Sequence, residues 1–211
     1  MTLDPLLAVI EVSAIFVSAI SGLIEAFRKR MDAVGVFAVA FVTAFGGGTL
    51  RDLLIDRRPL FWVQHQGYVW LVLALTLIAP PLLRATRHHV VDRLLQVTDA
   101  LGLGLFAISG ASLTLAAGMP VIIVTLMGVV TGVFGGVMRD VLCNEVPAVF
   151  QDHQPYALCA FCGCWVFVGL NGIGAESWLA FLAGAGTASG LRLAALAGGW
   201  RVPPWPPDRE G

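Results

Sequence analysis

The sequence predicts an all-α integral membrane protein, with seven transmembrane helices arranged as two inverted three-helix repeats plus a seventh helix. Three observations predict this fold class. The chain has 211 residues, of which 57% are hydrophobic and 13% charged, with a mean hydropathy of +0.82. Its apolar residues gather in seven long segments, and one stretch of sequence occurs twice. Ordinary soluble domains carry about 25% charged residues. So few charges cannot cover a globule in water, and we expect the bilayer as solvent.

Each of the seven apolar segments has nearly the length of a membrane-spanning helix. About 20 residues cross roughly 30 Å of hydrocarbon at about 1.5 Å per residue. The segments run over residues 5–27, 32–55, 66–83, 94–117, 119–142, 155–173 and 177–197. The fourth and fifth segments almost fuse, but Gly118 and Pro120 predict a turn between them.

The duplication covers residues 19–68, which are repeated without a gap at residues 107–156. The offset is 88 residues, and 17 of the 50 aligned positions are identical. The shared patterns are Ala-Ile-Ser-Gly, Gly-Gly-x-x-Arg-Asp and His-Gln-x-Tyr. We therefore predict a single membrane domain over residues 1–211. It divides into repeat one (about 5–83), repeat two (about 94–173), an extra helix (about 177–197) and a cytoplasmic tail (198–211).

The distribution of basic residues predicts the orientation of the chain. With seven spans, three Lys or Arg residues fall on the side of the N-terminus and ten fall on the other side. The positive-inside rule then places the N-terminus outside and the C-terminus in the cytoplasm. Each repeat has three spans, an odd number, so the second copy enters the membrane from the opposite side. Inverted repeats of this kind usually hold their working site near the midplane.

Glycines occupy equivalent places in the second and fifth segments, as Gly46, Gly47 and Gly48 and again as Gly135 and Gly136. Glycine is a weak helix former, so we expect each helix to break there. Freed carbonyl groups at the end of a half-helix would suit a cation. The alternative is that the glycines only allow neighbouring helices to approach closely.

Charged side chains within the segments also recur at the offset of 88 residues. Glu11 and Asp99 are equivalent, as are Arg51 and Arg139. A carboxylate inside a membrane is costly unless it is paired or hydrated. We predict two ion pairs, Glu11–Arg51 and Asp99–Arg139. The alternatives are that each carboxylate faces a water-filled vestibule alone and that the arginines extend to the membrane interface.

Further polar residues precede or follow the glycines in both copies. Asp52 and Asp140 come directly after the arginines, about 100° round the helix, so we expect them not to pair with those arginines but to cap or face the mouth of a pathway. Thr43 and Thr131 lie roughly one turn before the glycines. Their hydroxyl groups would bind an ion or opened backbone, or they would bond the carbonyl group four residues earlier.

Other chemistry finds little support in the sequence. No phosphate-binding loop, nucleophile elbow, metalloprotease motif or dinucleotide fingerprint is present. We therefore expect no enzyme, no catalytic residue and no cofactor. Cys159, Cys162 and Cys164 lie within an apolar segment, where we interpret them as structural rather than as metal ligands. The formal net charge of −1 gives no basic field for nucleic acid.

The doubled glycine motif carries a resemblance to a known family. At residues 46–52, 134–140, 99–102 and 191–194 the chain resembles the bacterial branch of the trimeric intracellular cation (TRIC) channels. The resemblance implies a homotrimer in a bacterial inner membrane, with one pore inside each subunit that passes monovalent cations, chiefly potassium. It also implies that the second and fifth spans are kinked at their glycines and line the pore. Lysines that bind an inositol lipid in animal members have no matching pair here.

The sequence leaves two transport functions open. In the first, K⁺ or Na⁺ crosses each protomer between the repeats, past the carboxylates, while Arg51 and Arg139 balance those charges and form gates by moving. In the second, the same inverted repeat serves alternating access for a small amino acid such as glycine, since sequences of this branch have also been grouped as glycine transporters. A scaffold without conduction is a third interpretation. The expected partners are other copies of the chain, membrane lipid and monovalent cations.

Overall fold

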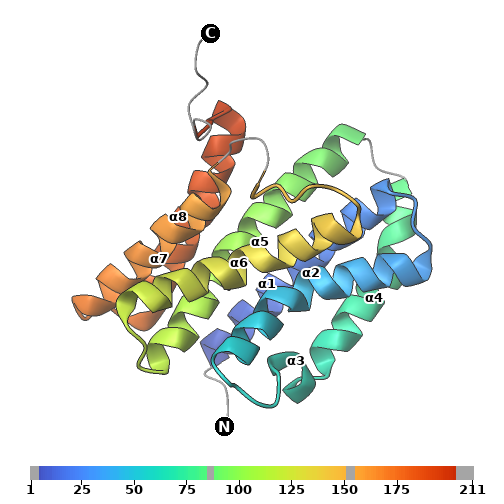
Figure 1. Cartoon of the computed structure of the whole chain (residues 1–211). Coiled ribbons are helices and arrows are strands. Elements are labelled where there is room, and N and C mark those ends of the chain that lie inside the picture. Colours follow the sequence, from blue (N-terminus) through green and yellow to red (C-terminus); the bar gives the residue numbers. More distant parts are fainter. Residues whose placement is uncertain (1–4, 85–87, 151–154, 203–211) are drawn as a thin grey trace.

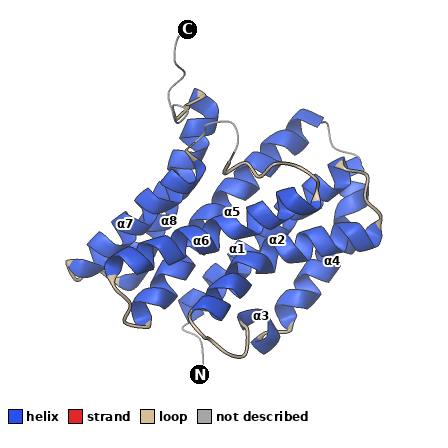
Figure 2. Cartoon of the chain, in the orientation of Figure 1, coloured by secondary structure: helices blue, strands red, loops and turns tan. Residues whose placement is uncertain are grey.

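The computed structural model describes residues 5–84, 88–150 and 155–202. These residues form eight helices and no strand (Figure 2). The helices are α1 (Pro5–Arg28), α2 (Ala33–Leu54), α3 (Phe61–Gln64), α4 (Gly67–Arg84), α5 (His88–Ala116), α6 (Val121–Leu142), α7 (Tyr156–Gly172) and α8 (Ser177–Gly198). The all-α class predicted from composition is confirmed, and the structure adds the four-residue helix α3. The proline-rich tail after residue 202 lies outside the described residues.

The long helices coincide with the apolar segments, with one exception. Helix α5 begins at His88, six residues before the segment predicted from hydropathy. Its first turns are polar, and Asp92 lies 3.7 Å from the guanidinium group of Arg28. Hydropathy marks only the part of a helix that suits hydrocarbon, so it misses a polar extension of this kind. The predicted turn at Gly118, which has a φ of 74°, is present between α5 and α6.

Five of the helices are long and apolar enough to cross a membrane, namely α1, α2, α5, α6 and α8. The apolar stretches of α4 and α7 are shorter, over Gly67–Ala79 and Tyr156–Gly172. Large hydrophobic side chains are exposed on the outer faces of several helices, including Trp70, Leu77, Ile122 and Leu182. Such surfaces are costly in water and are expected where a helix faces lipid.

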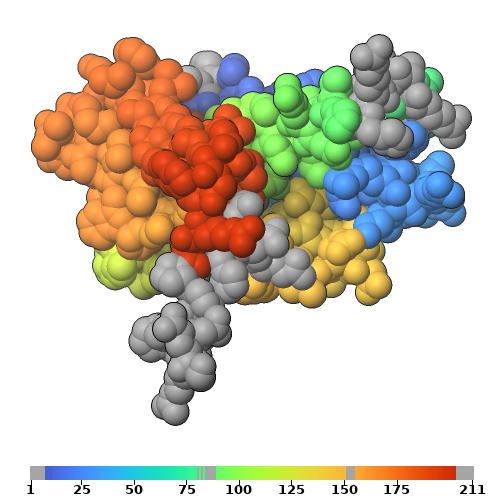
Figure 3. All heavy atoms as spheres, turned by 90° about the horizontal axis from the view of Figure 1, so that it is seen from above, coloured from blue at the N-terminus to red at the C-terminus, as the bar shows by residue number. Residues whose placement is uncertain are grey.

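Helices α1, α2, α5 and α6 form the centre of the molecule (Figure 1). Helix α1 packs against α2 and α5, and α6 packs against α5 and α2. Helix α4 covers α1 and α2, while α7 packs against α6 and α8. Helix α8 also rests on α5, and Figure 3 shows α7 and α8 (orange and red) together on one side of the molecule, with part of α2 (blue) on the other.

Small residues allow these helices to pack closely against one another. A Cβ atom added at Gly132 of α6 would lie 2.7 Å from the carbonyl oxygen of Leu103 in α5. One added at Gly163 of α7 would lie 2.6 Å from the carbonyl oxygen of Gly184 in α8. Real Cβ atoms do not come this near to a carbonyl oxygen, so larger residues would separate the helices. Close packing of backbones is the usual basis of helix association within membranes.

Backbone conformation repeats with the sequence. Arg30 and Gly118 have φ values of 55° and 74°, and they are 88 residues apart. Asp56 and Asn144, again 88 residues apart, have φ values of 54° and 56°. Left-handed backbone is uncommon for residues other than glycine. Its occurrence at equivalent positions indicates that the turns after α1 and α5, and those after α2 and α6, are built alike.

Candidate functional site

The glycine motifs meet where α2 crosses α6. A Cβ atom at Gly47 would overlap the carbonyl oxygen of Thr131, and one at Gly135 would overlap the carbonyl oxygen of Thr43. The two contacts are reciprocal between the copies. Residue 47 of α2 faces residue 131 of α6, while residue 43 faces residue 135, so the two helices run antiparallel at the crossing.

The predicted breaks at these glycines are wrong. Helix α2 continues without interruption through Gly46, Gly47 and Gly48, and α6 continues through Gly135 and Gly136. Glycine lowers helix stability by only about 1 kcal/mol, whereas an unsatisfied peptide group in hydrocarbon costs several kcal/mol. The close-packing alternative is therefore the correct interpretation of the helices.

The remaining glycines of the two motifs face different neighbours. A Cβ atom at Gly48 would overlap the ring of Phe61 in α3. At Gly136 it would lie 3.3 Å from the hydroxyl oxygen of Tyr156 and 3.7 Å from the carboxylate of Asp99. At Gly46 its nearest neighbours are 3.8 Å away, so this position alone of the triplet has room for a side chain.

Thr43 and Thr131 use their hydroxyl groups within their own helices. Each donates a hydrogen bond of 2.6 Å to the carbonyl oxygen four residues earlier, that of Val39 or Met127. The predicted alternative of backbone bonding is confirmed for both threonines. Their side chains also fill the space next to glycines of the neighbouring helices: Gly22 of α1 faces Thr43, and Gly110 of α5 faces Thr131.

Charged residues of the second repeat form one buried group, the second cluster, which consists of Asp99, Arg139 and Asp140. Arg139 Nη1 donates to Asp99 Oδ1 at 2.7 Å, so the predicted Asp99–Arg139 ion pair is confirmed. Arg139 Nε also donates to Asp140 Oδ1 at 2.9 Å. The same guanidinium group reaches across to the hydroxyl oxygen of Ser21 in α1. Only 6% of the Arg139 surface is exposed.

The equivalent first cluster, which consists of Glu11, Arg51 and Asp52, is arranged differently. Arg51 Nη2 lies 2.7 Å from Asp52 Oδ1, and Arg51 Nη1 donates to the Ser109 hydroxyl oxygen of α5 at 3.4 Å. The predicted Glu11–Arg51 ion pair is wrong, since the two side chains form no salt bridge. The carboxylate of Glu11 instead accepts a hydrogen bond of 3.4 Å from the hydroxyl group of Tyr68.

The expectation that each arginine would not pair with the following aspartate is also wrong. Adjacent residues leave a helix about 100° apart, which keeps short side chains from facing each other. An arginine side chain is long enough to turn round the helix surface. Arg51 Nε therefore reaches Asp52 Oδ1 at 2.9 Å, the same length as in the second repeat. Short-range spacing rules do not apply to so long a side chain.

The second carboxylate oxygen of each aspartate holds the chain that follows the helix. Asp52 Oδ2 accepts from the backbone N–H of Phe61 at 2.8 Å, and Asp140 Oδ2 accepts from that of Ala148 at 3.0 Å. The expected capping role is confirmed for Asp52, because Phe61 is the first residue of α3, whereas the partner of Asp140 lies in a turn. Each aspartate therefore ties an arginine to the segment that returns towards the next long helix.

The serine contacts link the repeats to each other. Arg51 in repeat one binds Ser109 in repeat two, and Arg139 in repeat two binds Ser21 in repeat one. Because α2 and α6 run antiparallel, the two arginines lie on opposite sides of the glycine crossing. In this register, Val39 of α2 lies opposite Arg139 of α6. Arg51 is twelve residues further along α2 than Val39, so the two arginines are separated by about 18 Å along the helix.

Several contributors were missed by the sequence interpretation. Tyr68 and Tyr156 stand 88 residues apart beside the two clusters, and this repetition within His-Gln-x-Tyr is the signal that could have found them. Arg57 Nη1 lies 3.7 Å from Asp52 Oδ1. Arg192 of α8 stands over the ring of Tyr156, 4.7 Å from its centre. The position equivalent to Arg57 is Glu145, and Arg192 lies in the helix that has no equivalent, so no periodic signal marks either arginine.

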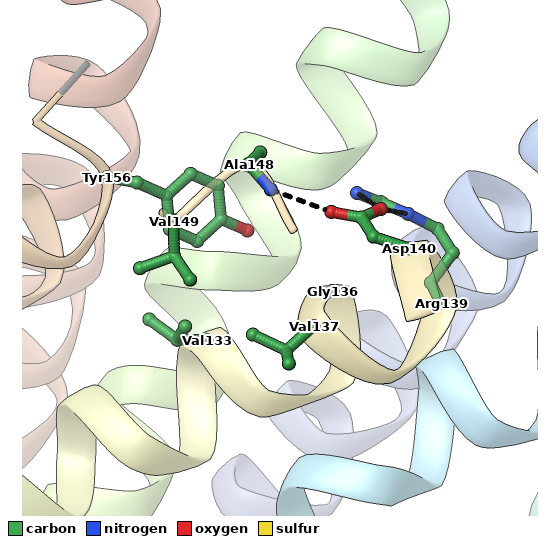
Figure 4. A pocket seen from close by; sticks show the side chains of 8 residues that line it. All are labelled: Val133, Gly136, Val137, Arg139, Asp140, Ala148, Val149 and Tyr156. Carbon is green, nitrogen blue, oxygen red and sulfur yellow. Dashed lines mark hydrogen bonds and ion pairs between the residues drawn. The ribbon is translucent and has the colours of Figure 1, made fainter. Parts of the chain in front are cut away.

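A narrow pocket adjoins the second cluster. Figure 4 shows Arg139 and Asp140 on one side and the Tyr156 ring on the other, with Val133 and Val137 below. The pocket has no room for a water-sized sphere.

Metal chemistry finds no site among the described residues, which contain no group of three His, Cys, Asp or Glu side chains suited to hold an ion. Cys159 and Cys164 are buried in helices, with their sulfur atoms directed at backbone carbonyl groups. His65 stacks on Tyr68 with ring centres 5.2 Å apart. Its equivalent, His153, lies outside the described residues.

Fold and site together define a multi-span, all-helical membrane protein in which two equivalent groups of charges are buried between the helices. A protein-family model described as "Glycine transporter" matches residues 8–83 and again residues 96–171. The second match begins and ends 88 residues after the first, which is the offset of the duplication.

Comparison with individual proteins identifies the family. The chain is 34% identical over 191 residues to a UPF0126 membrane protein of Vibrio cholerae, covering 90% of this chain and 79% of that one. It is 37% identical over 147 residues to the UPF0126 inner membrane protein YadS of Escherichia coli, covering 70% of each. A solved TRIC trimeric intracellular cation channel orthologue from Rhodobacter sphaeroides is 34% identical, with a TM-score of 0.87 over 93% of this chain and 100% of that one. The chain belongs to the bacterial TRIC channel family.

Proposed function

We propose that this protein is a potassium-permeable cation channel of a bacterial inner membrane, with a pore inside each protomer between two inverted repeats. The observation that carries the proposal is the reciprocal arrangement at the crossing of α2 and α6. Two buried arginine–carboxylate clusters flank the crossing, and each arginine binds a serine of the opposite repeat. Buried charges inside a membrane protein mark a pathway for ions more often than a purely structural core.

The contact of α2 with α6 supports inversion of the repeats, and the distribution of basic residues supports an orientation of the chain. The antiparallel contact of α2 and α6 is the relation expected of equivalent helices about an axis in the membrane plane. The positive-inside rule places the N-terminus outside and the C-terminus in the cytoplasm. The first cluster then lies in the outer half of the pathway and the second in the inner half, and α8 is an addition to the two repeats.

In this proposal the clusters both attract cations and block the pathway for them. Glu11, Asp52, Asp99 and Asp140 provide negative charge for a cation, and the glycine crossing with Thr43 and Thr131 forms the narrow centre. In this conformation the guanidinium groups bind three of these carboxylates, those of Asp52, Asp99 and Asp140, while Glu11 accepts from Tyr68. In this proposal the arginines act as gates, and conduction requires them to move away from these partners. Assembly into a homotrimer, supported by the trimeric TRIC channel orthologue to which the chain is similar, completes the proposal.

The description of the matching family model favours one other function, that of a small amino-acid transporter. An amino acid carries a carboxylate that Arg51 or Arg139 could bind and an ammonium group that the aspartates could bind. Alternating access would then use the same two halves.

A pair of measurements on purified protein separates the two functions. Planar-bilayer recording in potassium chloride should show unitary currents that reverse near the potassium potential. Reconstituted vesicles should show no saturable exchange of labelled glycine. Exchange of glycine without unitary current would contradict the channel and support the transporter, while neither activity would leave a scaffold.

A further inference from the structure

The two clusters differ in the number of carboxylates that each arginine binds. In the second cluster, Arg139 Nη1 lies 2.7 Å from Asp99 Oδ1, and Arg139 Nη2 lies 2.9 Å from Asp140 Oδ1. In the first cluster, Arg51 forms a salt bridge with the following residue, Asp52, and with no other carboxylate among the described residues. The guanidinium group therefore bridges two carboxylates in one repeat and binds a single carboxylate in the other.

Glu11, the equivalent of Asp99, is the carboxylate without an arginine. Only 3% of its surface is exposed, and its charge acts on Arg51, yet no salt bridge joins the two side chains. Its carboxylate accepts a long hydrogen bond of 3.4 Å from Tyr68. A buried carboxylate in so apolar a setting is costly without a cationic partner. A further contact must therefore hold Arg51 away from Glu11.

The space beside one glycine of each motif identifies this contact. Gly48 and Gly136 are 88 residues apart. A Cβ atom at Gly136 would lie 3.7 Å from Asp99 Oδ1 and 3.8 Å from Arg139 Nη2, so the paired groups fill this space together with a tyrosine hydroxyl group. At Gly48 the three nearest atoms all belong to the ring of Phe61. A ring therefore occupies, in the first repeat, the place in which carboxylate and guanidinium group meet in the second.

The ring of Phe61 lies next to both sides of the missing ion pair. The guanidinium carbon of Arg51 is 5.2 Å from the ring centre, in the position where a ring face attracts a cation. The ring centre of Tyr68, the residue that donates to Glu11, is 6.4 Å away. Phe61 is 1% exposed, so water does not weaken the contact with the arginine.

The second repeat has no ring at the equivalent position. The residue 88 positions after Phe61 is Val149, which lines the pocket beside the second cluster (Figure 4). A valine side chain is smaller and has no ring face for a guanidinium group. The backbone contact of the aspartate is present in both repeats, since Asp52 accepts from the N–H of Phe61 and Asp140 from that of Ala148. The difference therefore lies in the side chain.

We propose that Phe61 of α3 is a positioning residue for Arg51. Its ring attracts the guanidinium group and fills the space in which Arg51 would otherwise meet Glu11. The arginine then stays on Asp52, and Glu11 remains a buried carboxylate that a cation in the first cluster can meet. This consequence for conduction rests on the proposed channel function, whereas the positioning of Arg51 does not.

The test gives the first repeat the side chain of the second. Phe61→Val removes the ring, and Phe61→Leu removes the ring face but keeps more of the volume; both keep the backbone N–H that binds Asp52. The matched control is Phe45→Val, because this buried ring lies 5.8 Å from that of Phe61 and forms no cation–π contact in the described structure. The melting temperature of the purified protein is measured in each background with and without Glu11→Gln.

Glu11→Gln should change the melting temperature little in the wild-type and Phe45→Val backgrounds, where it breaks no ion pair. In Phe61→Val and Phe61→Leu it should lower the melting temperature by at least about 5 °C more, because a buried pair with Arg51 has formed. Adding Arg51→Met to these backgrounds should abolish the extra loss, since the partner of Glu11 is then absent. Where Phe61→Val does not fold, Phe61→Leu gives the same comparison.

The unitary potassium current is the second readout. In Phe61→Leu the charge of Glu11 is neutralised by Arg51, so the current should fall by about twofold or more, because fixed charge sets the local cation concentration. Phe45→Val should keep the wild-type current. A wild-type protein without any current would refute the channel function alone, and the melting temperatures would still decide the role of Phe61.

Three outcomes would overturn the proposal. The first is the same effect of Glu11→Gln in the wild-type, Phe61→Val and Phe61→Leu backgrounds. The second is an equal extra loss in Phe45→Val, which would show that any lost ring has this effect. The third is failure of both Phe61→Val and Phe61→Leu to fold, which would assign the ring to the stability of the fold rather than to the placement of Arg51.

Discussion

Replacement of Gly47 by alanine tests the backbone crossing at the centre of the molecule. The new methyl group would overlap the carbonyl oxygen of Thr131, which is part of a helix backbone and cannot rotate away. Overpacking of a core costs about 1–3 kcal/mol, and contact with backbone belongs to the upper half of that range. Alanine recovers about 1 kcal/mol of helix stability relative to glycine. The free energy of unfolding should therefore fall by about 1–2 kcal/mol, and Gly135→Ala, which meets Thr43, should behave alike.

A glycine of α8 provides the matched control for this prediction. No atom outside its own helix lies within 4 Å of a Cβ atom at Gly186, so Gly186→Ala should raise the free energy of unfolding by up to about 1 kcal/mol. The assay is equilibrium unfolding in mixed detergent micelles, followed by loss of helical circular dichroism. If Gly47→Ala and Gly186→Ala both stabilise the protein, backbone contact does not set the separation of α2 and α6.

Three further predictions concern charge and backbone strain. Asp99→Asn should lower the free energy of unfolding by about 3–5 kcal/mol, because it breaks a buried ion pair. Glu11→Gln, which breaks no ion pair, should lower it less in the same unfolding assay. Equal losses would contradict the different pairing of Asp99 and Glu11. Arg30→Gly should raise stability by roughly 0.5–1 kcal/mol by relieving a left-handed residue, and a lower melting temperature would contradict that account. Lys29 lowers the pKa of Glu145, and Glu145 raises the pKa of Lys29, through their hydrogen bond. The stability gained from this contact should be complete between the ordinary pKa values, 4.5 and 10.5. It should be lost gradually as the pH falls through the lowered pKa of Glu145 or rises through the raised pKa of Lys29. The difference in melting temperature between wild type and Lys29→Met should therefore be largest inside this window and should shrink beyond both ends.

Hydropathy predicts most helices of the fold well, because the bilayer leaves an apolar run few other conformations. An apolar run of about 20 residues has few alternatives to a helix within a bilayer, so the ends of most helices lie within two residues of the predicted segments. Helix α5 departs from this rule because its start at His88 is polar and lies beyond the apolar run. The short helix α3 is likewise too brief to leave a periodic signal.

Side-chain partners were predicted less well, because each charge has several partners within reach. Asp99 meets Arg139 as predicted, yet the equivalent Glu11 meets Tyr68 while Arg51 turns to Asp52. Differences of one methylene group, of a neighbouring charge or of a neighbouring ring decide between such arrangements, and none of them is visible in spacing. The glycines show the same limit, since a sequence does not tell whether glycine opens a helix or admits a neighbour.

The contribution of α8 could not be foreseen from the repeat at all. Arg192 belongs to the helix without an equivalent, and it lies over the ring of Tyr156, which belongs to another helix. Such relations between distant parts of the chain require the packed structure.

The most direct test of conduction between α2 and α6 uses Gly46, because the nearest neighbours of a Cβ atom there are 3.8 Å away and a cysteine fits. The four native cysteines, at positions 143, 159, 162 and 164, are first replaced by alanine or serine. Single-channel recording of Gly46→Cys in this background should show a unitary potassium current that a charged, thiol-reactive methanethiosulfonate reagent reduces. A current that stays unchanged after complete modification would show that cations do not pass this crossing.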